Sequence, residues 1–257
     1  RMYYYTHAQN PRTMRIMVAE SADGLTWERI PLGQYHHCGE DTNIIVVEGI
    51  YEGANITQPS VVRPPSGGWR MYCWLHGQEQ GLIRYIICES DDGLKWRTIG
   101  IDSPAIFHPS DLEVGQASWT AGLTRANPDA RFDDRRTWEF QAAKRLRSND
   151  ATNVYYDEES KQFEMFSVWL LPNTPETGRQ TPHDNAPGAL RVIHRRTSAD
   201  GLAWSDPELV LMPLPTDPIT QQFYYLSQHR EASYRVGFLG NYHCWEQTMD
   251  LEMCFSR

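Results

Sequence analysis

The stretch SADGLTW at residues 21–27 returns as SDDGLKW at residues 90–96 and as SADGLAW at residues 198–204. A motif that recurs at a regular spacing indicates a repeated structural unit. The initial serines of the three copies stand 69 and 108 residues apart, and 108 is twice 54. One unit that lacks the motif therefore lies between the second copy and the third.

Each copy of the motif follows runs of residues that favour strands. RIMVAES, RYIICES and LRVIHRRTS lead into the serine, and aromatic-rich runs such as WRMYCWLHG and QFEMFSVWL come before them. Short β-branched and aromatic runs between Gly, Pro, Asn and Asp predict strands joined by turns. A further run opens some units, as in TNVYYDEE, and a fourth follows the tryptophan, as in PELVLMP. Four antiparallel strands in a unit of this length are typical of a β-propeller blade.

Five such units fit the chain, so we predict an all-β fold, a five-bladed β-propeller with four-stranded antiparallel blades. A single domain is expected over residues 1–257, with blades at about 1–35, 36–103, 104–148, 149–213 and 214–257. DLEMCFSR places Ser256 where another copy of the motif would start. We therefore expect a propeller that begins at the second strand of its first blade and lacks its last outer strand.

The motif itself is predicted to be structural. Asp-Gly supplies a tight turn, because glycine accepts positive φ and the aspartate side chain can bond nearby backbone amides. The tryptophan would then cover the hairpin and pack between blades. Because the turn leads from the third strand to the outer strand, away from the propeller axis, a catalytic role is not expected.

Composition excludes several classes of partner. The net charge of -9 argues against nucleic acid and against anionic membrane surfaces. No apolar run is long enough to span a bilayer, and the first residues, RMYYYTHAQN, do not resemble a signal peptide. A soluble protein is expected, in the bacterial cytoplasm or, if a signal peptide has been removed, in the periplasm or outside the cell. The five cysteines have no metal-ligand spacing, so we expect small core residues, no metal and no cofactor.

The repeated stretches carry a resemblance to known enzymes. The three motif copies, together with SADGLAWSDPELVL, resemble the SxDGxxW blade signature of five-bladed propeller glycosidases, including glycoside hydrolase families 32 and 43. DATNVYYDEESKQFEMF and LRVIHRRTSADGLAWSDP resemble a family 32-like bacterial group. The similarity covers most of the chain and is weakest over residues 101–147. In such propellers the innermost strands line a central channel, and the substrate pocket lies at one mouth of it.

The resemblance therefore directs attention to the segments that would begin innermost strands. These are residues 36–44, 54–60, 148–154 and 215–223. Aligning the TNI of the first segment with the TNV of the third brings Glu40 level with Asp150 and Asn43 level with Asn153. The substrate-binding residues predicted from these segments and from an isolated aromatic are His37, Asn43, Gln58, Asn153, Trp119 and Gln222.

Glycoside hydrolysis generally needs two carboxyl groups, one as proton donor and one as nucleophile or as base for water. The resemblance implies Asp41 or Glu40 as base or nucleophile and Asp150 as the carboxylate that orients the acid. Glu113 is the candidate acid, although some propeller glycosidases use histidine for that role. For each carboxylate taken singly, a turn cap or an exposed strand end is the structural alternative.

The hypothesis that follows is a glycosidase acting on a plant or algal oligosaccharide, with its paired carboxylates at the mouth of the channel. A glycoside phosphorylase is the near alternative, and it would need an anion pocket to which Arg145, Arg147 and His37 could contribute. A carbohydrate-binding propeller without catalysis is the alternative from another class. The expected partner is a small-molecule or oligosaccharide substrate, whose identity the sequence leaves open along with the oligomeric state.

Overall fold

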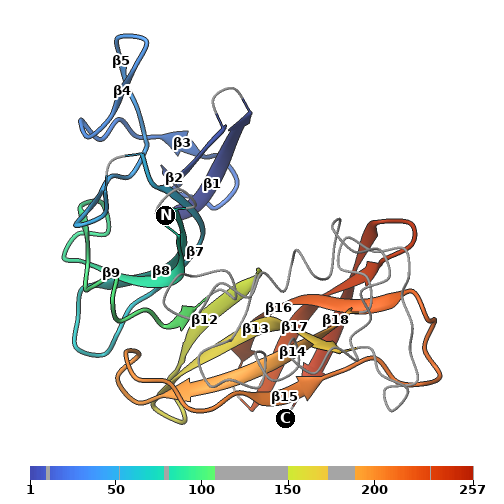
Figure 1. Cartoon of the computed structure of the whole chain (residues 1–257). Coiled ribbons are helices and arrows are strands. Elements are labelled where there is room, and N and C mark those ends of the chain that lie inside the picture. Colours follow the sequence, from blue (N-terminus) through green and yellow to red (C-terminus); the bar gives the residue numbers. More distant parts are fainter. Residues whose placement is uncertain are drawn as a thin grey trace. The chain divides into compact units, whose positions relative to one another are not determined.

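In the residues that it describes, the computed structural model of the chain consists of strands, turns and loops (Figure 1). It describes residues 1–9, 12–51, 53–77, 81–107, 150–172, 189–231 and 233–256. Within these ranges no helix is long and apolar enough to cross a membrane. The chain divides into two compact units, of which the first holds Arg1–Ile106 with Val154–Tyr156 and the second holds Phe107–Asn153 with Asp157–Arg257.

The first unit contains two larger antiparallel sheets and a small hairpin. One sheet has the order β1-β2-β3, and the other has the order β7-β8-β9-β10, with β6 parallel to β10 and β11 against β9. The bounds are β1 Met2–Gln9, β2 Arg12–Glu20, β3 Glu28–Arg29, β4 His36–His37, β5 Glu40–Asp41, β6 Val47–Glu48, β7 Asn55–Val62, β8 Trp69–Gly77, β9 Leu82–Ser90, β10 Trp96–Thr98 and β11 Ile106–Phe107.

The core of the first unit lies between its two sheets. Alternate residues of β2, Ile16 and Val18, are fully buried, and they join Met71, Cys73, Leu75, Ile86, Cys88 and Trp96 in one apolar cluster. Each large apolar side chain buried in this way stabilises the fold by roughly 1.5–3 kcal/mol. Period-2 alternation in RIMVAE therefore decides which face of β2 meets its neighbours.

The second unit is built from a four-stranded sheet, β12-β13-β14-β15, and a three-stranded sheet, β16-β17-β18. Their bounds are β12 Thr152–Asp157, β13 Gln162–Pro172, β14 Ala189–Ser198, β15 Glu208–Leu211, β16 Gln221–Glu231, β17 Tyr234–His243 and β18 Thr248–Ser256. Strands β13 and β14 contact β16. Phe166, Val168 and Ile193 on the first sheet and Leu226 and Leu239 on the second are all buried.

The prediction of a structural turn is confirmed in all three copies of the motif. The turn joins β2 to β3, β9 to β10 and β14 to β15. In the second copy, Ser90 Oγ accepts a hydrogen bond from the amide of Gly93 at 2.8 Å, and Asp92 Oδ1 accepts bonds from the amides of Leu94 and Lys95 at 2.7 and 2.9 Å. The other two copies repeat these bonds.

The tryptophan of the motif closes the same turn in the first two copies. Its indole N–H donates to the carbonyl of the motif glycine, from Trp27 to Gly24 at 3.2 Å and from Trp96 to Gly93 at 3.1 Å. Trp96 is buried in the core, whereas Trp27 is 38% exposed. Packing of the tryptophan therefore differs between copies, although the turn does not.

The prediction of an all-β fold is confirmed, while the blade boundaries stay a prediction. One local expectation is wrong, because residues 36–44 do not begin a long strand. Residues 36–41 form the exposed β4-β5 hairpin, and Ile44 bridges Met17 of β2. Glycine at position 39, with φ 82, and Cys38, with φ 52, reverse the chain there.

The cysteine prediction is partly confirmed. Cys73, Cys88 and Cys244 are buried thiols, but Cys38 is exposed in the β4-β5 turn and Cys254 is half-buried. A hydrogen bond with Cys73, together with burial, raises the pKa of the Cys88 thiol, so Cys88 stays protonated and behaves as a small apolar residue.

Replacing Asp92 with alanine should destabilise the protein by about 1 kcal/mol, because two backbone amides lose their acceptor. Hydrogen bonds from the amides of Lys95 and Leu94 lower the pKa of Asp92. Its contribution is therefore complete above the usual aspartate pKa of about 4 and is lost as pH falls through the lowered value. Urea unfolding across this pH range measures the effect.

The matched control is Asp91→Ala, because the neighbouring carboxylate makes no hydrogen bond to any described residue. This control should change the free energy of unfolding by less than about 0.5 kcal/mol. Equal losses in the two variants, or a loss in Asp92→Ala that persists at low pH, would contradict the assigned role of the turn.

Candidate functional site

A partly exposed carboxylate stands just before β12, where the sequence predicts a site residue. Asp150 accepts a hydrogen bond from the hydroxyl of Tyr224 on β16, 74 residues further along the chain. Burial and the negative charge of Asp150 raise the pKa of Tyr224. The phenol therefore stays protonated and remains a donor to this carboxylate.

A β-bulge places Tyr224 in this position. In the pairing of β16 with β17, Phe223 stands opposite Asn241 and Tyr225 stands opposite Gly240, so Tyr224 is the extra residue. A bulge interrupts the regular alternation of side chains and redirects the one that it adds. In a regular strand, Tyr224 and Tyr225 of QQFYYLSQ would point to opposite faces of the sheet. The bulge sets the direction of Tyr224 instead.

A buried guanidinium packs against the same tyrosine. The Arg191 guanidinium carbon lies 5.2 Å from the ring centroid of Tyr224 and 5.1 Å from that of Tyr242, and the two rings meet edge to face at 5.5 Å. Gln222, with no exposed surface, accepts hydrogen bonds from Arg191 through both the guanidinium, at 2.8 Å, and the backbone amide, at 3.1 Å. We call Asp150, Arg191, Gln222, Tyr224 and Tyr242 the Asp150 cluster.

Three of the predicted site residues meet along β16. Asp150 and Gln222 belong to the Asp150 cluster, and the Asn153 side-chain amide donates to the carbonyl of Leu226 at 3.0 Å. Sequence reasoning did not identify Tyr224, Tyr242 or Arg191. PTDPITQQF did point to the start of β16, but the local sequence does not predict the bulge and the pairing register that bring these groups together.

Two more predicted residues lie in the first unit. Asn43 is buried, and its side-chain amide donates to the hydroxyl of Tyr4 at 2.9 Å and to the carbonyl of Val18 at 2.7 Å. These contacts indicate a structural role for Asn43, which holds its segment against β1 and β2. Gln58 occupies a bulge of β7 with φ 51, a conformation that is uncommon for residues other than glycine.

The bulges of β7 and β16 fall at the same place in their strands. Gln58 is the fourth residue of β7, as Tyr224 is of β16. Next to Gln58, the hydroxyl of Thr57 and Nε2 of His76 are 3.1 Å apart. Of the two residues, only Gln58 has a positive φ, and such a backbone outlier is a candidate for function because the surrounding structure must offset its cost of about 1–3 kcal/mol.

The three remaining described candidates lie in the exposed β4-β5 hairpin. Asp41 accepts hydrogen bonds from the amide of Gly33 at 2.7 and 2.9 Å and from the amide of Thr42 at 2.9 Å. His37 pairs with Glu40 across the hairpin, and both are exposed. Asp41 therefore caps a turn here, which is the structural alternative that the sequence allowed. Glu113, Trp119, Arg145 and Arg147 lie outside the described residues.

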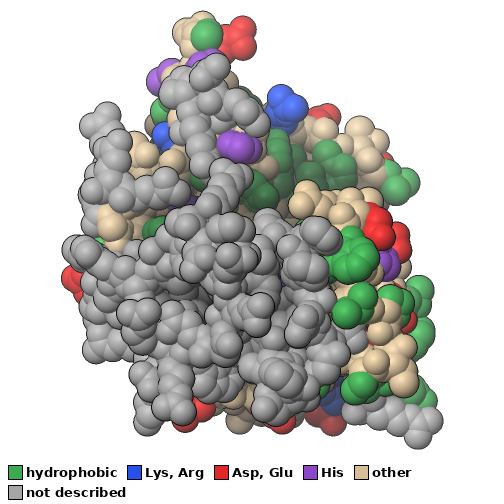
Figure 2. Space-filling view, turned by 45° about the vertical axis from the view of Figure 1, so that its right-hand side comes forward, with side chains coloured by type: hydrophobic (Ala, Val, Ile, Leu, Met, Phe, Trp, Pro, Cys, Tyr) green, Lys and Arg blue, Asp and Glu red, His purple; other side chains and the backbone are tan. Residues whose placement is uncertain are grey.

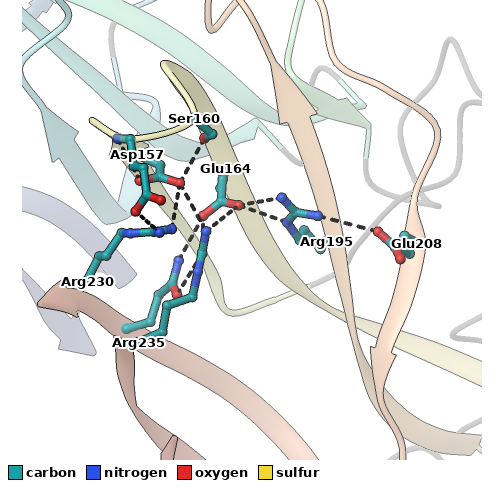
Figure 3. A network of polar contacts seen from close by, with 9 residues as sticks. Asp157, Ser160, Glu164, Arg195, Glu208, Arg230 and Arg235 are labelled. Carbon is teal, nitrogen blue, oxygen red and sulfur yellow. Dashed lines mark hydrogen bonds and ion pairs between the residues drawn. The ribbon is translucent and has the colours of Figure 1, made fainter. Parts of the chain in front are cut away.

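A second polar cluster, centred on the almost fully buried Glu164, joins the two sheets of the second unit (Figure 3). Glu164 Oε1 accepts hydrogen bonds from Arg195 at 2.5 and 2.9 Å, and Arg235 bonds both carboxylate oxygens. Asp157 accepts bonds from Arg235 and Arg230, each at 3.1 Å. We call Asp157, Glu164, Arg195, Arg230 and Arg235 the Glu164 network.

Charge compensation in the Glu164 network favours a structural role. Burial alone would raise the pKa of Glu164, but hydrogen bonds from Arg235 and Arg195 outweigh it and hold that pKa below its usual value. The pKa of Asp157 is also lowered, because its bonds to Ser160 and to the arginines exceed the effect of burial. Both carboxylates are ionised and occupied at neutral pH, unlike a general acid.

One buried histidine lies on the opposite face of β14 from Arg195. His194 packs against Trp169 with ring centroids 4.2 Å apart, and its Nδ1 has no hydrogen-bond partner within the part of the chain that the structure describes. Burial lowers the pKa of His194 to about 4. The ring is therefore neutral at physiological pH. Among the described residues no group of three His, Cys, Asp or Glu could hold a metal ion.

Comparison with known proteins shows a shared fold. No protein-family model matches the chain, and no curated protein matches it. A solved structure of a glycoside hydrolase is similar at a TM-score of 0.55 and 12% identity, over 95% of this chain and 62% of the other. A second is described as part of the GH130 family of mannoside phosphorylases, which contains glycoside hydrolases that target β-1,2 mannosidic linkages in Candida mannan. This second structure is similar at a TM-score of 0.50 and 12% identity, over 95% of this chain and 57% of the other.

A third similar structure is a Cellvibrio cellulosa α-L-arabinanase complexed with arabinohexaose, at a TM-score of 0.48 and 12% identity, over 98% of this chain and 68% of the other. The chain spans less than two thirds of the length of the first two structures. These likenesses define a class by fold: the chain is a partial match to the five-bladed propeller of glycoside hydrolases.

Replacing Glu164 with glutamine should destabilise the protein by about 3 kcal/mol, because Arg195 and Arg235 lose a buried counter-ion. The stabilisation from Glu164 is complete above the usual glutamate pKa of about 4.3 and is lost as pH falls through the lowered value in the folded protein. Equilibrium unfolding in urea at neutral pH measures the difference between the two proteins.

Glu208→Gln is the matched control, because Glu208 also pairs with Arg195, at 3.5 Å, but is 67% exposed at its side chain. Exposed ion pairs contribute little, so this change should cost less than about 1 kcal/mol. If Glu164→Gln and Glu208→Gln lower the free energy of unfolding equally, the Glu164 network does not hold the two sheets together.

Proposed function

We propose that the protein is a glycosidase that cleaves a plant or algal oligosaccharide, with Asp150 as one of the carboxyl groups of its site. The observation that carries the proposal is the Asp150 cluster, in which a partly exposed carboxylate just before β12 is held by a half-buried phenol. The shared fold with glycoside hydrolases supports the same class of chemistry.

The surroundings of Asp150 suit a carboxylate that must keep one orientation during a reaction. Tyr224 occupies one oxygen, and Arg191 with Tyr242 restrains the tyrosine ring from its other sides. Gln222 in turn restrains Arg191. A site whose groups are positioned before substrate arrives loses less free energy to reorganisation.

A second carboxyl group is needed for hydrolysis. Asp41, Glu40 and Glu113 remain the proposals for it. The hydrogen bonds of Asp41 to Gly33 and Thr42 favour a turn cap, and Glu113 lies outside the described residues. Asp150 would then either react directly or orient the acid, as the resemblance implies.

Phosphorolysis is the second candidate, supported by the likeness to a structure described with the mannoside phosphorylases. A phosphorylase needs a cationic pocket for phosphate beside its carboxylate. Arg191 is the cation of the Asp150 cluster, but its stacking on two tyrosines and its bonds to Gln222 already engage it. Hydrolysis is therefore the function that the cluster favours.

The proposal is tested by measuring sugar release from a panel of aryl glycosides and plant and algal polysaccharides, with and without inorganic phosphate. We expect release that does not depend on phosphate. Asp150→Asn should lower kcat/KM by about a thousandfold, since general acid–base groups typically contribute 10²–10⁴. Tyr224→Phe should lower it by roughly tenfold, because one hydrogen bond to a charged group is lost.

Asp206→Asn is the control, because Asp206 is an exposed aspartate that follows the third copy of the motif. It should keep full activity.

Asp41→Asn separates the two roles of that residue: a loss of stability with normal kcat indicates a turn cap, and a loss of kcat with normal stability indicates a base or nucleophile. Unchanged kcat/KM in Asp150→Asn contradicts the site. Sugar binding without release indicates the non-catalytic alternative, and phosphate-dependent release indicates the phosphorylase.

A further inference from the structure

A cavity lies between the two sheets of the second unit. Its volume is about 380 Å³, which is in the range of pockets that hold small organic groups. One wall comes from β13, β14 and β15, and the other comes from β16, β17 and β18. Phe166, Leu211 and Leu226 supply apolar surface, and Arg195 and Arg235 supply positive charge. We call this space the inter-sheet cavity.

In the first unit, a motif tryptophan fills the space between the two larger sheets. Trp96 is only 3% exposed and belongs to the apolar cluster that both sheets share. Its ring meets that of Tyr3 edge to face, with centroids 5.9 Å apart. Register defines this place on the β7-β8-β9-β10 sheet, where Met71 stands opposite Cys88, two residues before the motif serine, Ser90. On the facing sheet, Tyr3 stands opposite the residue three positions before the motif serine that follows β2.

The same register in the second unit leads to the inter-sheet cavity. Gly237 stands opposite Cys254, two residues before Ser256, which stands where the repeat spacing places a motif serine. On the facing sheet, Phe166 stands opposite Arg195, three residues before the motif serine at the end of β14. All five residues line the cavity, and none of the described residues that line it is a tryptophan. The cavity therefore occupies the place that the motif tryptophan fills in the first unit.

Strand β18 forms a sheet edge beside the cavity. Within the part of the chain that the structure describes, β18 pairs only with β17. Its residues are mostly exposed, and hydrophobic and acidic side chains lie side by side over the C-terminal sheet on the right-hand side of the space-filling view (Figure 2). An edge strand presents unpaired N–H and C=O groups to an extended segment that approaches it. In the first unit the corresponding edge is covered, because Arg97 and Thr98, which follow Trp96, pair with β9.

We propose that the inter-sheet cavity and the edge of β18 bind a peptide segment of the SxDGxxW type, which pairs with β18 as an added strand and inserts its tryptophan into the cavity. In strand addition, main-chain hydrogen bonds give affinity and a side-chain pocket gives specificity. The register of β10 on β9 sets the expected position, with the tryptophan beside Ser256 and the next two residues opposite Phe255 and Cys254. This inference does not depend on the proposed function.

The lining of the inter-sheet cavity favours an aromatic side chain over a charged one. Phe166 stands where Tyr3 stands in the first unit, so its ring can meet an indole edge to face. Arg195 and Arg235 also line the cavity, and hydrogen bonds to Glu164 hold both guanidinium groups in place. A guanidinium group attracts the face of an indole but repels a lysine side chain. Tryptophan therefore suits the cavity in both shape and charge.

The first test titrates the whole protein into a fluorescein-labelled peptide that copies residues 90–100, SDDGLKWRTIG. We expect a saturable rise in the fluorescence anisotropy of the peptide. The peptide that carries Trp96→Ala should bind at least about tenfold more weakly, since a buried tryptophan supplies much of the binding free energy of an interface. A peptide of the same composition in scrambled order is the second control, and it should also bind at least about tenfold more weakly.

Two variants of the protein locate the bound peptide. Cys254→Phe places a ring in the inter-sheet cavity and should weaken peptide binding at least about tenfold, because the ring and the indole compete for the same volume. Met253→Phe is the matched control, because Met253 is 55% exposed and points to the opposite face of the strand. This control should bind the peptide normally. Urea unfolding checks that both variants keep the fold.

Thiol modification tests the same site in the unchanged protein. Cys254 is half-buried and lines the cavity, whereas Cys38 is exposed in the turn between β4 and β5. Peptide at about ten times its Kd should slow the alkylation of Cys254 by iodoacetamide about tenfold and leave that of Cys38 unchanged.

An absence of peptide binding up to millimolar concentration overturns the proposal. Equal affinity for the tryptophan and alanine peptides also overturns it, because the cavity then does not receive the indole. Unchanged affinity in a folded Cys254→Phe variant, or unchanged alkylation of Cys254 at saturating peptide, shows that the peptide binds elsewhere and has the same consequence.

Discussion

The hydrogen bonds that an aspartate side chain makes to backbone amides inside the DGLxW turn underlie the architecture of this protein. In the second copy, Asp92 and Ser90 accept three amide hydrogens within six residues, and Trp96 returns its indole N–H to Gly93. Because every partner is local, the turn can form wherever the seven letters occur. It sends the chain from one strand into its antiparallel neighbour, from β2 to β3, from β9 to β10 and from β14 to β15, and so sets the strand order in each sheet that carries it.

Departures from that regular plan create the candidate site. A strand that alternates strictly places one residue in two on each face, which suits a core but not a cluster of converging polar groups. The bulges of β7 and β16 break this alternation at the same strand position. On β16 the extra residue, Tyr224, meets Asp150 and the guanidinium of Arg191. The functional hypothesis therefore depends on an irregularity within a repeated scaffold.

Two polar clusters of the second unit show how similar groups can serve different ends. Glu164 is buried and bonded by two arginines, so its charge is compensated and its pKa is lowered. Asp150 is partly exposed and bonded by a neutral phenol. A buried carboxylate saturated by guanidinium groups stabilises packing, whereas a partly exposed carboxylate is accessible to a ligand. This contrast, more than the number of carboxylates, identifies Asp150 as the better candidate.

The sequence by itself determined the all-β class, the repeated unit and the structural role of its turn, because these depend on contacts within a few residues and on period-2 patterning. It also pointed to Asp150, Asn153 and Gln222 through their position beside strand starts. Only the tertiary structure decided which groups meet Asp150, since Tyr224 is 74 residues away and a bulge sets its direction. The same reason explains the error at residues 36–44. The segments TNI at 42–44 and TNV at 152–154 are similar in sequence. In the first, Ile44 pairs with Met17 of β2, whereas the second forms the start of β12. Local chemistry specifies turns, whereas register and bulges come from the packing of whole strands.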